Sequence, residues 1–130
     1  EALGRFVHDH VDILFANQDE AASLFDSSTE AAMDTLCGQV DEAIITRGAD
    51  GAFVGHKGDR HDFPARPQGP VVDSTGAGDL FAAGYLYGRT NGRDAGQSGI
   101  IASLAAGEVI SHIGARPEAD IAALVRADGL

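Results

Sequence analysis

Two short apolar runs, separated by helical patterns, constrain the fold of this 130-residue chain more than any other feature. They are Val11–Ala16 and Glu42–Thr46, and polar or turn-forming residues bound both of them. Apolar runs of this length are typical of strands that are buried in a parallel sheet. Helical patterns occupy residues 2–10, 18–25 and 29–40. The alternation predicts an α/β fold in which helices cover a largely parallel sheet.

The remainder of the sequence predicts a hairpin followed by helices. Two strands, Ala52–His56 and Arg60–Phe63, flank a turn. The helical patterns that follow cover Gly76–Tyr87, Asp94–Ser111 and Pro117–Arg126. The last of these is expected to begin at its proline, because a proline in the first turn of a helix loses no hydrogen bond. The first is apolar on nearly all sides, so its large side chains are expected in the core. These side chains are Phe81, Tyr85, Leu86 and Tyr87.

The excess of acidic over basic residues limits which molecules the chain is expected to bind. The chain has 9 Lys and Arg against 20 Asp and Glu, a formal net charge of −11. Binding to nucleic acid regardless of base sequence depends on basic side chains, so we expect no nucleic-acid partner. We also expect no affinity for anionic membranes, and no apolar run reaches the ~18–20 residues of a membrane helix. The expected compartment is the cytoplasm.

Cysteine and histidine residues offer no evident metal site. Cys37 is the single cysteine, which excludes an internal disulfide and a multi-cysteine zinc site. It lies in a helical pattern without a basic neighbour, so it is expected to be a packed thiol. The five histidines show no metal-ligand spacing. The chain begins at Glu1 rather than at a methionine, from which we expect that upstream sequence is missing.

The segment with the clearest chemistry is Gly76-Ala77-Gly78-Asp79, at the start of an apolar helix. Helix N-termini leave backbone N–H groups unpaired and carry a partial positive charge, and glycines let an anion approach those amides closely. The segment therefore predicts a phosphate-binding site with a carboxylate beside it. Such a carboxylate can accept a proton from an attacking hydroxyl. A glycine-rich helix entry with an aspartate placed to suit the helix dipole is the structural alternative.

Two other segments also have structural and functional interpretations. Asn17-x-x-Glu20 is a capping-box pattern, in which the asparagine caps a helix and the glutamate reaches back. Thr46-x-Gly48, with Gly51 after it, is typical of a turn that follows a strand. The carboxyl ends of parallel strands are also where α/β sheets bind ligands, so the two interpretations can coexist.

The string Asp-Ser-Thr-Gly-Ala-Gly-Asp at 73–79, followed by Leu-Phe-Ala-Ala-Gly-Tyr-Leu, resembles the C-terminal signature of the ribokinase-like (PfkB) sugar and nucleoside kinases. Asn17-x-x-Glu20, Thr46-x-Gly48 and Gly114-Ala115 resemble further landmarks of that family and fall in the same order. The resemblance covers essentially the whole chain and is closest to the adenosine-kinase-like branch. It implies a three-layer α/β/α sandwich with a largely parallel sheet. Residues 1–130 would be the C-terminal, ATP-binding portion, without the N-terminal acceptor half and lid.

The resemblance also implies roles for individual residues. Asp79 would be the catalytic base, and the amides of Gly76, Ala77 and Gly78 would form the anion hole for the γ-phosphoryl group. Asn17 and Glu20 would organise Mg²⁺, mostly through water. Thr46 and Gly48 would contact the nucleotide phosphates, with Gly51 closing the turn. Asp73 and Thr75 match positions that bind a monovalent cation such as K⁺ in some members.

The implied activity is transfer of the γ-phosphoryl group of ATP to a hydroxyl of a small sugar or nucleoside. The alternative is a non-catalytic nucleotide-binding fragment or module that lacks the acceptor site. No P-loop, nucleophile-elbow or HExxH pattern occurs, which argues against P-loop NTPases and the common hydrolases. The sequence identifies neither the acceptor nor the oligomeric state.

Overall fold

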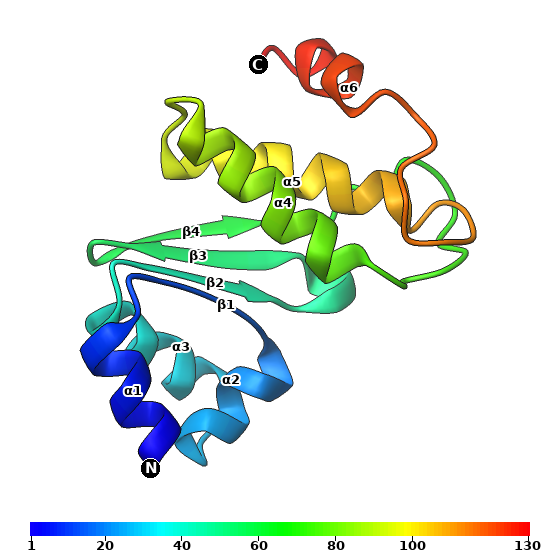
Figure 1. Ribbon diagram of the computed structural model, residues 1–130. Helices are drawn as coiled ribbons and strands as arrows, with labels where there is room; N and C mark the ends of the chain where they lie inside the picture. Colours follow the sequence, from blue (N-terminus) through cyan, green and yellow to red (C-terminus); the bar gives the residue numbers. More distant parts are fainter. The chain divides into compact units, whose positions relative to one another are not determined.

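The computed structural model describes all 130 residues, which form two compact units, Glu1–Asp62 and Phe63–Leu130. The first unit holds a sheet and three α-helices, and the second holds three further α-helices (Figure 1). The elements from the N-terminus to the end of the sheet are α1 (Ala2–His10), β1 (Ile13–Asn17), α2 (Gln18–Phe25), α3 (Thr29–Gln39), β2 (Glu42–Thr46), the 3₁₀ turn η1 (Gly48–Asp50), β3 (Ala52–His56) and β4 (Asp59–Phe63). The remaining helices are α4 (Ala77–Thr90), α5 (Ala95–Val109) and α6 (Ile121–Ala127).

The sheet has the strand order β1-β2-β3-β4 and is mixed. Strands β1 and β2 are parallel, whereas β2 and β3 are antiparallel. The expectation of a largely parallel sheet is therefore wrong for these residues. The physical reason lies in the connections, because only the β1–β2 connection carries helices long enough for a parallel crossover. Short turns join β2 to β3 and β3 to β4, and short turns connect antiparallel neighbours.

Helices α1, α2 and α3 lie together against one face of the sheet (Figure 1). Their buried side chains form a core with Ala43, Ile45 and Phe53 of the strands. Met33 and Leu36 of α3 are fully buried in it. Ala43 and Ile45 are two positions apart on β2, so both side chains point toward the helices, as expected for a strand with one covered face.

Cys37 is a packed thiol, as its sequence context predicts. A Cβ atom placed on Gly55 would overlap the Sγ of Cys37, so the thiol occupies the space that any larger residue at position 55 would need. Burial raises the pKa of Cys37, with Asp34 adding to the rise and Arg60 opposing it. Burial and the raised pKa make the thiolate, the reactive form, scarce.

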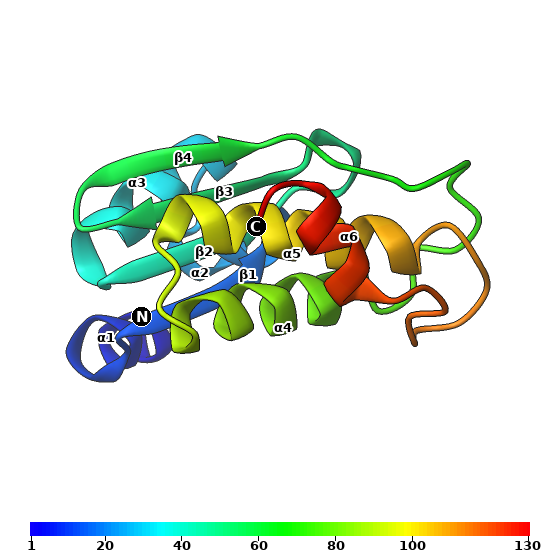
Figure 2. The same ribbon diagram turned by 90° about the horizontal axis from the view of Figure 1, so that it is seen from above.

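In the second unit, α4 and α5 run side by side over most of their length (Figure 2). Two glycines of α4 allow the close approach. A Cβ on Gly84 would lie 2.8 Å from the Cα of Ala102, and one on Gly88 would lie 2.8 Å from the Cα of Ser98. Close helix packing therefore accounts for the small residues of α5.

Two details differ from the sequence-based expectations. Helix α6 begins at Ile121 rather than at Pro117, because the side chain of Asp120 caps it by accepting the Ala123 amide. In α4, Phe81 and Tyr85 are buried, but Leu86 and Tyr87 are 40% and 60% exposed. The apolar sequence of α4 thus predicted more burial than the structure shows. Leu86 and Tyr87 follow Tyr85 directly, and they face away from the side of the helix on which Tyr85 is buried. No helix combines the length and the apolar character that crossing a membrane requires.

Candidate functional site

The N-terminus of α4 is built to present backbone amides. Gly76 precedes the helix with φ +81°, a left-handed conformation that favours glycine. A Cβ on it would lie only 2.7 Å from the Cβ of Ala115, so the position has no space for a side chain either. The Ala77 amide donates to the Ser74 carbonyl at 3.2 Å.

The structure shows which amides at this helix start have hydrogen-bond acceptors within the chain. Of the three amides assigned to the anion hole from the sequence, that of Ala77 is engaged in the turn. The amides of Gly76, Gly78 and Asp79 donate to no acceptor of the chain. The Asp79 amide is a donor that the sequence reasoning did not include, although its place in the first helical turn could have indicated it. The helix dipole adds to the attraction for an anion at this point.

Asp79 itself lies in the first turn of α4 with an exposed side chain. Nothing in the second unit covers the carboxylate, so a small hydroxyl-bearing molecule can reach it. The Asp79 carboxylate, which can accept a proton, thus lies on the same helical turn as the amides of Gly78 and Asp79, which have no hydrogen-bond acceptor in the chain.

Asp73 ties two loops together beside this helix start. Its Oδ1 accepts the Thr75 amide at 3.0 Å and its Oδ2 accepts the Gly114 amide at 3.1 Å. The hydroxyl and amide of Thr75, followed by the Gly114 amide, lower the pKa of the Asp73 carboxyl. These three donors occupy three of the four lone-pair sites of the carboxylate, so the ionised side chain keeps one for a monovalent cation.

The remaining predicted site residues lie in the first unit. The Asn17 side chain accepts the Glu20 amide at 2.8 Å, and the Glu20 carboxylate accepts the Asn17 amide at 2.9 Å. The capping-box interpretation is therefore confirmed. The bond to Asn17 uses Oε2 of Glu20 and leaves its Oε1 for water or a cation. A single carboxylate acting largely through water suits Mg²⁺, which keeps most of its hydration shell.

Thr46 ends β2, and the chain then turns through η1. The Arg47 amide donates to the Gly51 carbonyl at 2.8 Å, and the Gly51 amide donates to the Gly48 carbonyl at 3.1 Å. Gly48 and Gly51 both have positive φ angles, +58° and +87°. The turn interpretation of this segment is thus confirmed.

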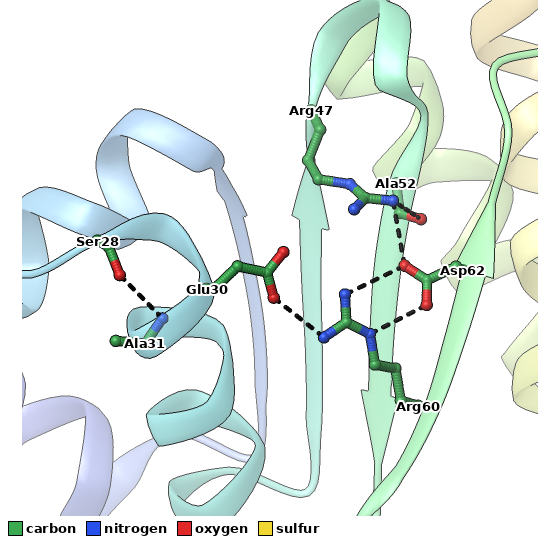
Figure 3. A network of polar contacts seen from close by, with 7 residues as sticks. All are labelled: Ser28, Glu30, Ala31, Arg47, Ala52, Arg60 and Asp62. Carbon is green, nitrogen blue, oxygen red and sulfur yellow. Dashed lines mark hydrogen bonds and ion pairs between the residues drawn. The ribbon is translucent and has the colours of Figure 1, made fainter.

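A polar network holds this turn against the strands (Figure 3). The Arg47 guanidinium donates to the Ala52 carbonyl at 3.3 Å and to Asp62 at 3.2 Å. Arg60 binds Asp62 from the other side, lies over the ring of Phe53 and reaches Glu30 at 3.2 Å. Its hydrogen bond is the main reason why the pKa of Asp62 is lowered, against a smaller effect of burial. The sequence reasoning missed this network, although the i, i+2 spacing of Arg60 and Asp62 places both on one face of β4.

The predicted site residues thus form two groups. Asn17, Glu20 and the Thr46–Gly51 turn belong to the first unit, and Asp73–Asp79 belongs to the second. Within the first unit, Asn17 and Thr46 are direct partners in the parallel pairing of β1 and β2.

Comparison with known proteins finds sugar and nucleoside kinases that resemble the chain. Over 109 residues the chain is 31% identical to a nucleoside kinase of Methanocaldococcus jannaschii, covering 82% of this chain and 35% of that protein. A crystal structure of a probable sugar kinase from Rhizobium etli matches 98% of the chain and 39% of its own chain, at 37% identity and a TM-score of 0.91. The adenosine kinase of Sinorhizobium meliloti matches 98% of the chain and 40% of its own, at 35% identity and a TM-score of 0.90.

These neighbours define the class: the chain has a ribokinase-like α/β fold. The family model of the pfkB family carbohydrate kinases matches residues 2–122, and the chain belongs to that family. Its relatives are sugar and nucleoside kinases. The chain spans 35% and 42% of the length of two curated relatives that it matches.

Proposed function

We propose that these residues are the ATP-binding portion of a kinase that transfers the γ-phosphoryl group of ATP to a hydroxyl of a sugar or nucleoside. Membership of a family of carbohydrate kinases supports this general reaction. The observation that carries it is the start of α4, where an exposed carboxylate, Asp79, follows amides that have no acceptor in the chain.

In this proposal, Asp79 accepts the proton of the attacking hydroxyl. The amides of Gly76, Gly78 and Asp79 hold the transferring phosphoryl group. Phosphoryl transfer depends chiefly on positioning and charge stabilisation, and fixed amides at a helix N-terminus supply both. The glycine at 78 leaves room for the close approach, since nothing lies within 4 Å of a Cβ placed there.

The first unit would serve the nucleotide. Thr46 and Gly48 would contact its phosphates from the turn at the end of β2, and Glu20 would hold Mg²⁺ through water. Mg²⁺, when bound, neutralises charge on the phosphate oxygens. Asp73 and Thr75 would hold a monovalent cation such as K⁺ beside the anion hole.

A non-catalytic nucleotide-binding module is the second candidate. The chain spans only 35% of the length of the nucleoside kinase of M. jannaschii. The intact mass of the protein as its own cell makes it separates the two. A product of well over 13.4 kDa supports the kinase, and a product of 13.4 kDa favours the module.

The chemical test replaces Asp79 in the natural full-length protein and measures phosphoryl transfer from ATP against a panel of sugars and nucleosides. Asp79→Asn should lower turnover by about 10²-fold or more, as expected for loss of a general base. Binding of Mg·ATP, measured by calorimetry, should stay nearly intact.

Asp120→Asn is the matched control, because it removes the same charge while asparagine still caps α6. Its turnover should equal that of the unsubstituted protein. A loss of less than threefold in Asp79→Asn would remove Asp79 from the role of base.

A further inference from the structure

A buried carboxylate in α5 has no part in the mechanism above. Glu108 is only 4% exposed. Its Oε1 accepts three hydrogen bonds, from the Ala119 amide at 2.9 Å, the Glu118 amide at 3.0 Å and Nε2 of His112 at 3.1 Å. Its Oε2 is buried without a partner. Burying a carboxylate is unfavourable unless its partners compensate, so these donors carry the whole compensation.

All three donors belong to one segment, residues 112–119, which connects α5 to α6. Two of them are backbone amides that lie ten and eleven positions beyond Glu108. The carboxylate therefore fastens the far end of this segment to the C-terminal turn of α5. At the near end, the Ile110 carbonyl accepts the amides of Val72 and Asp73 at 2.8 and 3.3 Å.

The middle of the same segment contacts the start of α4 at two points. The Gly114 amide donates to Oδ2 of Asp73 at 3.1 Å. Ala115 fills the space beside Gly76, because a Cβ placed on Gly76 would lie 2.7 Å from the Cβ of Ala115. Both contacts fix the backbone that leads into the acceptor-free amides. A displacement of the segment would therefore move those amides.

Electrostatics favour the charged forms of both Glu108 and His112. Burial raises the pKa of Glu108, but the amides of Ala119 and Glu118 together with His112 outweigh it, so the net shift is downward. The Ile113 carbonyl raises the pKa of His112, burial opposes this, and Glu108 and Glu118 add to the rise. The charged groups facing the imidazole are thus Glu108 on α5, Glu118 on the segment itself and Asp73 before α4, whose pKa His112 helps to lower.

We propose that Glu108 is a positioning residue for the anion hole: by fastening residues 112–119, it holds Asp73 and Gly76, and through them the first amides of α4, in the geometry that binds a transferring phosphoryl group. This inference rests on the proposed function, because it takes those amides as the group that meets the phosphoryl. It assigns a role to a residue that lies outside the Gly-Ala-Gly-Asp segment and acts through other residues.

The test compares Glu108→Gln, which keeps one acceptor oxygen, with Glu108→Leu, which keeps none, in the natural full-length protein. Turnover should fall in both variants and further in the leucine variant, by about tenfold or more. The KM for ATP should change by less than about twofold, since the residues proposed to contact the nucleotide lie elsewhere. Partial rescue by glutamine distinguishes hydrogen-bonded positioning from simple packing.

Glu118→Gln is the matched control. Its carboxylate faces the same imidazole at 3.7 Å and is 71% exposed, while its backbone amide, the group that Glu108 binds, is retained. Its turnover should stay within twofold of the unsubstituted protein.

Amide hydrogen exchange gives the readout that does not depend on activity. In both Glu108 variants, exchange should accelerate at the hydrogen-bonded amides of Thr75, Ala77, Leu80 and Gly114, and should stay unchanged in β2 and β3. Unchanged exchange at these four amides, or turnover within threefold in the leucine variant, overturns the role of Glu108. Absence of phosphoryl transfer by the unsubstituted protein overturns the proposed function instead, and the exchange pattern then still decides whether Glu108 controls the α4 amides.

Discussion

Asn17 and Thr46 lie opposite each other as register partners at the carboxyl ends of the parallel strands β1 and β2. Asn17 begins the capping box of α2, and Thr46 begins the turn through η1. The parallel pairing therefore brings together two sequence motifs that are separated along the chain by two helices and a strand. Ligands of open α/β sheets bind at this end of the strands.

Glu20 allows the capping role to be separated from a metal-binding role. Glutamine at the third helical position also completes a capping box, so Glu20→Gln should leave the free energy of unfolding within about 0.5 kcal/mol of the original value. If Glu20 organises Mg²⁺ through water, the Mg²⁺ concentration for half-maximal activity should rise by about tenfold. Denaturant titration and a Mg²⁺ titration of activity measure the two effects.

Asn17→Ala is the converse control, because it removes the cap and should lower stability by about 1 kcal/mol. An unchanged Mg²⁺ requirement in Glu20→Gln would leave the glutamate with capping alone.

Gly76 and Gly78 form a matched pair for testing the proposed anion hole. Gly76→Ala should destabilise the protein by about 1–3 kcal/mol, since the position has φ +81° and a Cβ would meet Ala115 at 2.7 Å. Gly78→Ala should leave stability equal or higher, by up to about 1 kcal/mol, because the site is open and helical. Its methyl group would nonetheless obstruct the approach of a phosphate.

We therefore expect Gly78→Ala to be well folded but to lose most of its turnover, and Gly76→Ala to lower the melting temperature. Thermal unfolding with parallel kinetics checks both. A fully active Gly78→Ala protein would contradict close approach of the phosphoryl group at this position.

The Arg47–Asp62 contact should matter for the nucleotide rather than for stability. Asp62 is half exposed, and exposed ion pairs contribute roughly 0.2–1 kcal/mol. Asp62→Asn should therefore change the unfolding free energy little. Loosening of the Thr46–Gly51 turn should raise the KM for ATP by about fivefold, because misplacement of a positioning group weakens binding.

Glu30→Gln is the control for this network. It removes only the outer contact to Arg60 and leaves the Arg47–Asp62 bond in place. Equal KM values for ATP in the two variants would show that the network does not act through Arg47.

The Glu108–His112 pair should give stability a defined pH dependence. The pKa of Glu108 is lowered from 4.5, so the stability that its charge contributes is present above pH 4.5. This stability is lost as the pH falls through the pKa that Glu108 has in the folded protein. The pKa of His112 is raised from 6.5, so its contribution is complete below pH 6.5 and is lost as the pH rises through the folded-state value. Both contributions are therefore present together between pH 4.5 and 6.5.

The difference in melting temperature between the original protein and His112→Gln should be widest in that interval and should narrow at higher pH. Thermal unfolding from pH 4 to 9 measures it. A difference that is independent of pH would mean that the imidazole contributes packing and no charge.

Some features of this protein follow from the sequence by itself, because neighbouring residues decide them. The capping box of Asn17 and Glu20, the bounds of α2 and the glycine-rich start of α4 depend on contacts three or four residues apart. The motif string at 73–79 is equally local, and it sufficed to indicate the family. The alternation of apolar strands and helical patterns indicated the α/β class, although it overstated how much of the sheet is parallel.

Only the tertiary structure decided which distant segments meet. The pairing of Asn17 with Thr46, the contact of Ala115 with Gly76 and the fastening of residues 118 and 119 by Glu108 join parts of the chain that no local pattern relates. The exposure of Tyr87 likewise depends on the packing of the folded chain. Local periodicity sets which side of an element is apolar, but the packing of the folded chain sets what that side touches.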